Sequence, residues 1–163
     1  MTVAELRYEV HGLSVTFTGD VLEHFAKYRQ RRCYHREAGG QLFAKVRDKN
    51  WTISAVTGPR RSDLRSRFGF VPDKRIEQDE IYSYHAKGLE YVGDWHTHPQ
   101  DVPRPSPDDV ESIGNVVRLS QHHFPGFLLC IVGRIDFPEG LWLSFHDRRG
   151  RAYDARRLDV PAL

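Results

Sequence analysis

The sequence lacks an apolar stretch long enough to cross a membrane. Its longest apolar run, residues 127–132, has six residues, whereas a helical span of the bilayer core needs roughly 20. Near the N-terminus, Glu5 and Arg7 carry charge where a secretory signal would place its apolar segment. We therefore expect neither a membrane protein nor a secreted one.

Cysteine and excess charge are also scarce. Cys33 and Cys130 are too few for a disulfide framework or for a metal site made by cysteine alone, which favours a reducing, cytoplasmic setting. Twenty-four basic residues against 22 acidic ones leave a net charge of +2, too weak for binding nucleic acid along a whole face. We expect no nucleic-acid partner, and a length of 163 residues favours a single domain over residues 1–163.

The hydrophobic periodicity predicts strands at both ends of the chain with helices between them. The predicted helices start at Asp20, as part of a capping box with Glu23, at Asp73 and behind Ser106. The predicted strands cover residues 6–10, 13–17, 41–46, 51–57, 89–96, 127–132 and 141–145, while residues 58–72 are expected to form a surface loop. This order favours an α/β or α+β fold around one central sheet.

One segment, residues 93–109, concentrates side chains that can bind a metal. His96 and His98 are two apart, so on a strand both imidazoles face the same side. Ser106 and Pro107 mark a helix start, and Asp109 lies three residues after that cap. Two histidines and one carboxylate would leave a fourth zinc position open to water, as in catalytic zinc sites.

A metal-activated hydrolase also needs a carboxylate beside its water to accept and deliver a proton. Glu37 precedes the pair Gly39 and Gly40 and an apolar strand, about 60 residues upstream of the histidines. A glycine pair allows the chain to turn and to approach another backbone closely. Glu37 is therefore the candidate general base.

Together these residues resemble the JAMM signature of the JAB1/MPN/Mov34 metalloenzyme family: an upstream Glu, His-Thr-His, seven residues, Ser, two residues and Asp. The resemblance covers roughly residues 13–146 and implies the JAB1/MPN fold, which is cytidine-deaminase-like, with a curved mixed β-sheet flanked by helices. It implies one Zn²⁺ per chain bound by His96, His98 and Asp109, with Glu37 as general base and Ser106 stabilising the oxyanion. Ala44 stands where the family often has glycine.

The resemblance implies a zinc metalloprotease or isopeptidase that cleaves after the C-terminal tail of a ubiquitin-like or conjugated protein. Residues 91–99 resemble the compact bacterial JAB isopeptidases encoded with E1/E2-like proteins in CBASS-type antiphage operons. This similarity favours a role in antiviral defence and admits an E1/E2-like operon protein as a further partner. The sequence lacks the long insertions by which eukaryotic relatives choose a ubiquitin linkage.

Four alternatives compete with this hypothesis. A cupin should have a Glu three to five residues past the second histidine, where this chain has Asp101, Val102 and Pro103. An amidohydrolase barrel needs about 250 residues. A non-catalytic MPN-type docking module typically lacks part of the motif, whereas every motif residue is present here. This docking module and a protease that matures a sulfur-carrier protein stay open as alternatives.

The segment 58–72 is the candidate docking platform for the substrate because it is long, basic and aromatic. We expect Arg65 and Arg67 to contact acidic groups of the partner protein, and Phe68 and Phe70 to supply apolar contact. An uninvolved loop is an equally simple interpretation of this segment, and a solvated surface is the simpler interpretation of the arginine clusters.

Overall fold

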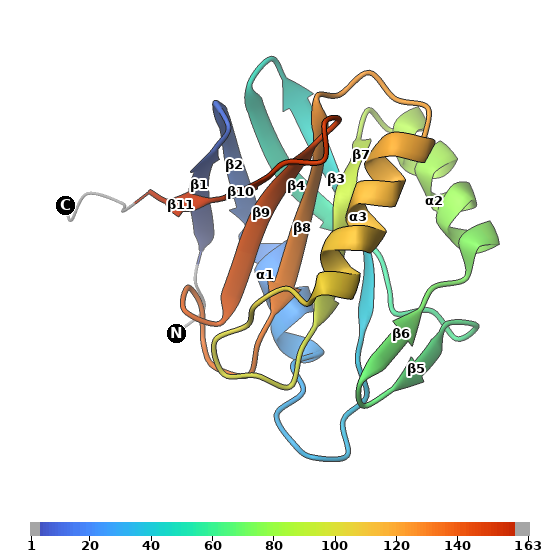
Figure 1. The fold of residues 1–163 in the computed structure, drawn as a ribbon, viewed down its shortest axis with the longest axis vertical. Coiled ribbons are helices and arrows are strands. Elements are labelled where there is room, and N and C mark those ends of the chain that lie inside the picture. The colour runs from blue at the N-terminus through green and yellow to red at the C-terminus, as the bar shows by residue number, and fades with distance from the viewer. Residues whose placement is uncertain (1–3, 159–163) are drawn as a thin grey trace.

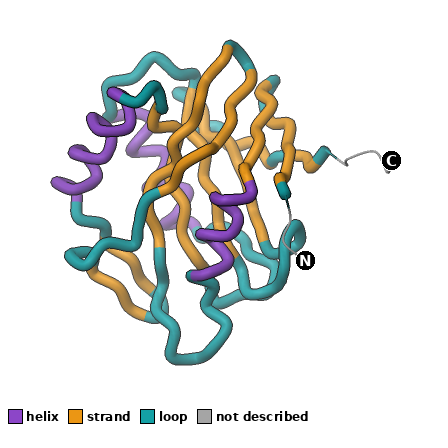
Figure 2. Tube along the Cα trace, turned by 180° about the vertical axis from the view of Figure 1, so that it is seen from behind, coloured by secondary structure: helices purple, strands orange, loops and turns teal. Residues whose placement is uncertain are grey.

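The computed structural model describes residues 4–158 and shows a large twisted sheet with helices on both faces (Figures 1 and 2). The strands are β1 (Glu5–Val10), β2 (Leu13–Thr18), β3 (Gly39–Arg47), β4 (Asn50–Val56), β5 (Leu64–Ser66), β6 (Gly69–Val71), β7 (Glu90–Thr97), β8 (Gly126–Val132), β9 (Leu141–Asp147), β10 (Ala152–Asp154) and β11 (Arg156–Arg157). The helices are α1 (Gly19–Lys27), α2 (Lys74–Ala86) and α3 (Pro107–Leu119).

The main sheet of the described residues is mixed, as predicted. Its nine strands lie in the order β10-β9-β8-β7-β3-β4-β2-β1-β11. The pairs β2–β4 and β7–β8 are parallel, and the other neighbours are antiparallel. At the centre of the sheet β3 pairs with β7, so that Gly39 lies opposite His96. Residues about 57 positions apart in the chain thereby become neighbours.

The central strand β8 is buried along its whole length, which explains its continuous apolar run. Leu128, Cys130 and Val132 pack into the core that includes Leu22 and Phe25 of α1. The alternate residues pack with α3, in a second core formed by Phe127, Leu129, Ile131, Ile113 and Val117. Helix α1 therefore covers one face of the sheet, and α3 with α2 covers the other (Figures 1 and 2). Cys130 is fully buried in the first of these cores.

Two local predictions are wrong. Helix α1 begins at Gly19 behind Thr18, which makes no side-chain cap hydrogen bond, so the capping box predicted from Asp20 does not form. The expected loop 58–72 contains the hairpin β5–β6, in which Arg65 lies opposite Phe70. Each of these strands has only three residues, too few for alternation to indicate a strand. In the described part of the chain, no helix is long and apolar enough to cross a membrane.

The glycine pair before β3 is required by close packing. A Cβ atom on Gly40 would lie 1.8 Å from the carbonyl oxygen of Thr57, and one on Gly39 would lie 2.8 Å from that of Trp95. Both contacts are shorter than any side-chain carbon tolerates, so only glycine allows β3 to approach β7 and the end of β4. This close approach brings the segment before β3, which carries Glu37, to the end of β7.

Candidate active site

The end of β7 meets the start of α3 at the candidate site. His96 and His98 lie at and just after the end of β7. At the start of α3, the Ser106 hydroxyl accepts a hydrogen bond from the backbone N–H of Asp109 at 3.1 Å, and the Asp109 carboxylate accepts one from the backbone N–H of Ser106 at 2.7 Å. This capping box fixes both side chains at the helix start, and the helix start predicted at Ser106 is confirmed.

The three predicted ligand side chains converge. The Nε2 atom of His96 lies 3.1 Å from Oδ1 of Asp109, and the Nε2 atom of His98 lies 3.1 Å from Oδ2 of the same carboxylate. The two Nε2 atoms are 3.1 Å apart. Tetrahedral zinc with bonds of about 2.0–2.1 Å holds its ligand atoms about 3.3 Å apart. The observed separations are close to this value, although each histidine meets a different oxygen of Asp109. The three side chains can hold a metal ion, and their donor atoms are of the kind that zinc binds.

The Asp109 carboxylate interacts electrostatically with the two histidines beside it. Burial opposes ionisation of Asp109, but the hydrogen bonds from His96 and His98 outweigh it and lower the pKa of this carboxyl group. Burial likewise opposes protonation of His98, yet Asp109 outweighs it and raises the pKa of this imidazole. A carboxylate that stays ionised between two imidazoles concentrates negative charge where a cation would bind.

Glu37 is buried, with 9% of its surface exposed, and lies just before β3 at the same end of the sheet. Burial raises the pKa of Glu37, while the nearby His96 and His98 lower it in part. A carboxylate whose pKa is raised is a better proton acceptor near neutral pH. The environment of Glu37 therefore suits the role of general base.

A single cleft of about 1190 Å³ connects these groups. Its walls are formed by the hairpin β5–β6 and by α2 and α3, and its floor by β7. All five motif residues line it, namely Glu37, His96, His98, Ser106 and Asp109. Farther from the metal position it is lined by apolar side chains such as Ile81, Val116 and Leu119. The structure thus brings the five predicted residues together in one open cleft.

The four residues predicted to bind substrate lie on the hairpin but in different settings. Phe68, which is 73% exposed, and Phe70 both line the cleft. The guanidinium of Arg67 lies over the ring of Phe68, 4.8 Å from its centre. Arg65 instead turns toward the segment that carries Glu37, where its Nε donates a 2.7 Å hydrogen bond to the carbonyl oxygen of Glu37. The hairpin therefore contacts both the cleft and the segment that carries Glu37.

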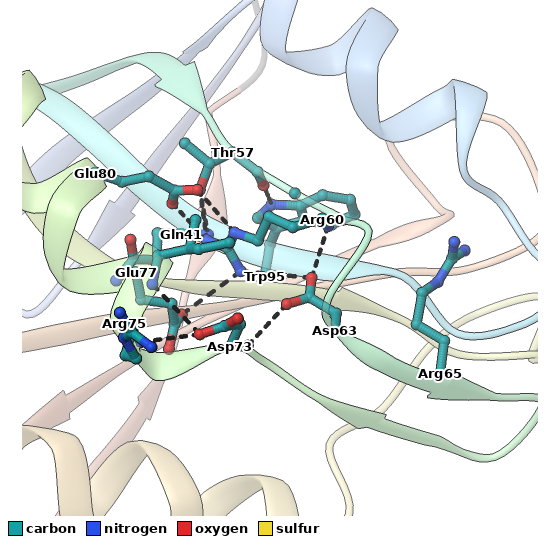
Figure 3. A network of polar contacts seen from close by, with 12 residues as sticks. Gln41, Thr57, Arg60, Asp63, Arg65, Asp73, Arg75, Glu77, Glu80 and Trp95 are labelled. Atoms are coloured by element: carbon teal, nitrogen blue, oxygen red, sulfur yellow. Dashed lines mark hydrogen bonds and ion pairs between the residues drawn. The ribbon is translucent and has the colours of Figure 1, made fainter.

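Arg60, from the same basic segment, is buried and bound by carboxylates (Figure 3). Its Nε donates to Oε1 of Glu80 at 2.7 Å, and a second nitrogen donates to the Thr57 hydroxyl at 2.9 Å. Asp63 accepts from the backbone N–H of Arg60 at 2.7 Å, and Glu77 lies 3.9 Å from the guanidinium. Arg60 therefore fastens α2 to the loop after β4 and is not available to a partner.

Sequence reasoning missed two buried polar residues behind the site. Gln30 is 1% exposed and Thr97 is fully buried. The Thr97 hydroxyl donates a 2.9 Å hydrogen bond to the Gln30 side chain and accepts one of 2.9 Å from the backbone N–H of Ala38. Gln30 lies in an arginine-rich segment that shows no periodicity, so nothing in the sequence distinguishes it. Trp95, which alternates with the histidines along β7, is buried on the other face of the strand.

This fold and this donor set define a class: α/β proteins with a candidate site for a metal-dependent hydrolase at one end of a mixed sheet. The chain belongs to the family of prokaryotic homologs of the JAB domain, which matches residues 20–144. The predicted JAB family membership and the mixed sheet flanked by helices are thereby confirmed.

Several curated relatives carry the name CD-NTase/cGAS isopeptidase. The one from Escherichia coli (strain TW11681) is 29% identical over 134 residues, which cover 80% of each chain. The one from Vibrio cholerae serotype O1 is 30% identical over 139 residues, which cover 82% of this chain and 83% of the relative. The solution structure of protein DSY2949 from Desulfitobacterium hafniense is similar in fold, with a TM-score of 0.61, 18% identity and coverage of 89% and 90% of the two chains.

Proposed function

We propose that this protein is a zinc-dependent isopeptidase that releases a conjugated protein, of the CD-NTase type named in its relatives, by hydrolysing the bond after its C-terminal tail. The observation that carries the proposal is the meeting of His96, His98 and Asp109 at 3.1 Å separations in the cleft that Glu37 also lines. Family membership and the names of the relatives support the substrate class.

His96, His98 and Asp109 would hold the metal. When bound, zinc supplies a Lewis acid that polarises a carbonyl group and makes a water molecule more acidic. Glu37 accepts the proton of the attacking water and then delivers it to the leaving amine of the target lysine. Its buried position and raised pKa suit a group that must first take up a proton and then release it.

Ser106 is placed to stabilise the oxyanion that forms on the scissile carbonyl. Its hydroxyl oxygen accepts the backbone N–H of Asp109, which leaves the hydroxyl proton to be donated into the cleft that Ser106 lines. The backbone dipoles at the start of α3 favour negative charge at the same place. A donor fixed in this way stabilises the transition state more than the ground state.

The hairpin offers a route for an extended tail. Among the described strands, β5 and β6 form a sheet of their own, and β6 lines the cleft. A tail can pair with the backbone of such an edge and place its last carbonyl group at the metal position. On this route Phe68 and Phe70 contact the tail, and Arg67 faces acidic groups on the folded part of the partner. Arg65, first expected to do the same, instead holds the segment that carries Glu37.

The test uses a CD-NTase, the class of protein named in the relatives, joined through its C-terminal tail to a reporter by a peptide bond and, in a second substrate, to a lysine side chain. The zinc-loaded protein should cleave both after the last tail residue. Glu37→Gln should retain zinc and lose about 10²–10⁴-fold in turnover. Full turnover by Glu37→Gln would contradict the mechanism.

Further substrates in the same assay, namely a sulfur-carrier protein fusion and unrelated unfolded peptides, separate the alternatives. Cleavage only of a sulfur-carrier protein fusion would favour a maturation protease. Cleavage of unrelated unfolded peptides at the same rate would indicate a general metallopeptidase. Binding without cleavage of any substrate would favour a docking module. In each case the isopeptidase proposal would be withdrawn.

A further inference from the structure

Glu37 lies outside the helices and strands of the described chain, in the connection between α1 and β3. A general base must nevertheless be held at one distance from the reacting atoms, because misplacement by about 1 Å can cost a factor of 10² in rate. Its fixation must therefore come from contacts made by the segment around it, His35–Ala38.

Gln30 makes three hydrogen bonds from a buried position. Its Nε2 donates to the carbonyl oxygen of His35 at 3.3 Å and to that of Arg67 at 2.9 Å. Its Oε1 accepts the hydroxyl proton of Thr97 at 2.9 Å. Both amide hydrogens and the oxygen are used, so the orientation of this amide is fixed. One side chain thereby joins the catalytic segment, the hairpin and the end of β7.

Thr97 links this amide to the metal ligands. It lies between His96 and His98 and points to the opposite face of the strand. Its backbone N–H donates to the carbonyl oxygen of Ala38 at 2.8 Å, and the backbone N–H of Ala38 donates to its hydroxyl at 2.9 Å. The residue after Glu37 is thus fastened to the residue between the two histidines.

The hairpin closes the arrangement from the other side. The backbone N–H of Glu37 donates to the carbonyl oxygen of Ser66 at 2.7 Å, and the carbonyl oxygen of Glu37 accepts from Arg65. Gln30 holds the same hairpin through Arg67. The hydrogen bonds of the Thr97 hydroxyl are buried, and those of the Gln30 amide to the two carbonyl oxygens are partly buried. A buried polar group that loses its partner destabilises the arrangement strongly.

We propose that Gln30, acting through Thr97, is a positioning residue that fixes Glu37 relative to the metal ligands. The same side chain holds the hairpin β5–β6 beside the segment that carries Glu37. This inference rests on the proposed function for its effect on catalysis. Its effect on the position of the segment is independent of any substrate. Because neither side chain belongs to the metal-binding set, their loss should leave metal binding intact.

The variants are chosen to remove hydrogen bonds with little change in shape. Gln30→Met keeps the length of the side chain without the amide. Thr97→Val keeps the shape of the side chain without the hydroxyl, and Thr97→Ser retains the hydroxyl. Ser144→Ala is the matched control, because Ser144 is 2% exposed and its hydroxyl accepts from Trp142 on β9, away from the cleft.

Two measurements are made on each variant. The first is hydrogen exchange at the Ala38 amide, with and without zinc. The second is the steady-state kinetics of the zinc-loaded protein on the tail fusion, together with its zinc content. Thr97→Val and Gln30→Met should speed exchange at Ala38 by about tenfold or more and lower kcat by about 10–100-fold. KM should change less than about threefold, and zinc content should stay at wild-type level. Thr97→Ser should show exchange at Ala38 and kcat close to the wild-type values.

Exchange at Ala38 no faster than in Ser144→Ala, or an unchanged kcat despite faster exchange, would overturn the proposal. If Gln30→Met does not fold, the comparison of Thr97→Val with Thr97→Ser decides, because the first keeps the shape without the hydroxyl and the second keeps the hydroxyl without the methyl group. If the wild-type protein cleaves no fusion, the proposed function fails. Exchange at Ala38 in the metal-free variants then decides whether Gln30 and Thr97 hold the segment.

Discussion

At the residue scale, Ser106 combines two roles in one hydroxyl group. Its oxygen caps α3 by accepting from Asp109, and its proton is the proposed donor to the oxyanion. Substitution by alanine removes both roles at once, so a loss of activity in Ser106→Ala could come from either. Glycine separates them, because at the cap position it costs only a few tenths of a kcal/mol.

We expect Ser106→Ala and Ser106→Gly to lose activity equally, by about 10²-fold in kcat. Only Ser106→Ala should also lose about 1 kcal/mol of stability, through the missing cap. Turnover of the tail fusion and urea unfolding check the two effects separately. Activity that follows stability, with Ser106→Gly near wild type, would assign Ser106 to the helix cap alone.

The residues that the sequence could predict are those whose chemistry restricts their type. Histidine pairs, a carboxylate behind a serine cap and an upstream glutamate form a pattern because few other side chains can bind zinc or exchange protons. Gln30 could not be predicted, because its role depends on three partners brought together only by the fold. Nor could the burial of Arg60 among carboxylates be predicted, since its neighbours in sequence include the exposed Arg61.

At the element scale, α2 is unusual because none of its residues is fully buried. Polar and aromatic contacts hold it in place: Asp73 caps its start, Tyr84 stacks on Phe43 at 4.3 Å, and Glu80 binds Arg60. Helix α3 could be predicted because its Ser-Pro start is local in the sequence. The hairpin β5–β6 could not, since its short strands depend on contacts with the segment that carries Glu37.

Removal of the Arg60 side chain should loosen α2. Arg60→Met leaves the side chains of Asp63 and Glu80, which are 0% and 17% exposed, without their cation. Breaking a buried ion pair from one side costs about 3–5 kcal/mol. Arg61→Met is the control, because Arg61 is exposed and its substitution should change stability by less than about 0.5 kcal/mol. Equal unfolding midpoints in urea for the two variants would contradict the role given to Arg60.

Glu77 should make α2 sensitive to pH. Burial and the nearby Asp94 raise its pKa to about 7, although Arg60 and Lys74 act in the opposite direction. Because the unfolded value is about 4.3, the folded state binds the proton more tightly, and stability falls as the pH rises through 7. Glu77→Gln should therefore raise the melting temperature relative to wild type more at pH 8 than at pH 5. Asp79→Asn, on the exposed face of α2, should show no such trend, and a constant difference for Glu77→Gln would refute this account.

At the scale of the whole molecule, the fold rests on apolar cores on both faces of the sheet, and the candidate metal ligands lie outside them at one end of β7. A chain of this length buries about 70% of its unfolded surface without help from a metal. Metal binding and folding should therefore be linked only by mass action, in contrast to small zinc domains that unfold without their ion.

Removal of zinc by a chelator should accordingly abolish cleavage and leave the far-ultraviolet circular dichroism unchanged. Zinc at 100 times its dissociation constant adds about 2.7 kcal/mol of stability, and at roughly 2–4 °C per kcal/mol for a domain of this size the melting temperature should fall by about 5–11 °C on chelation. The double variant His96→Ala/His98→Ala should melt at one temperature with or without zinc, because it retains only the Asp109 carboxylate of the donor set. Collapse of the circular dichroism on chelation would instead make the metal part of the folding core, and the core and the site would not be separate.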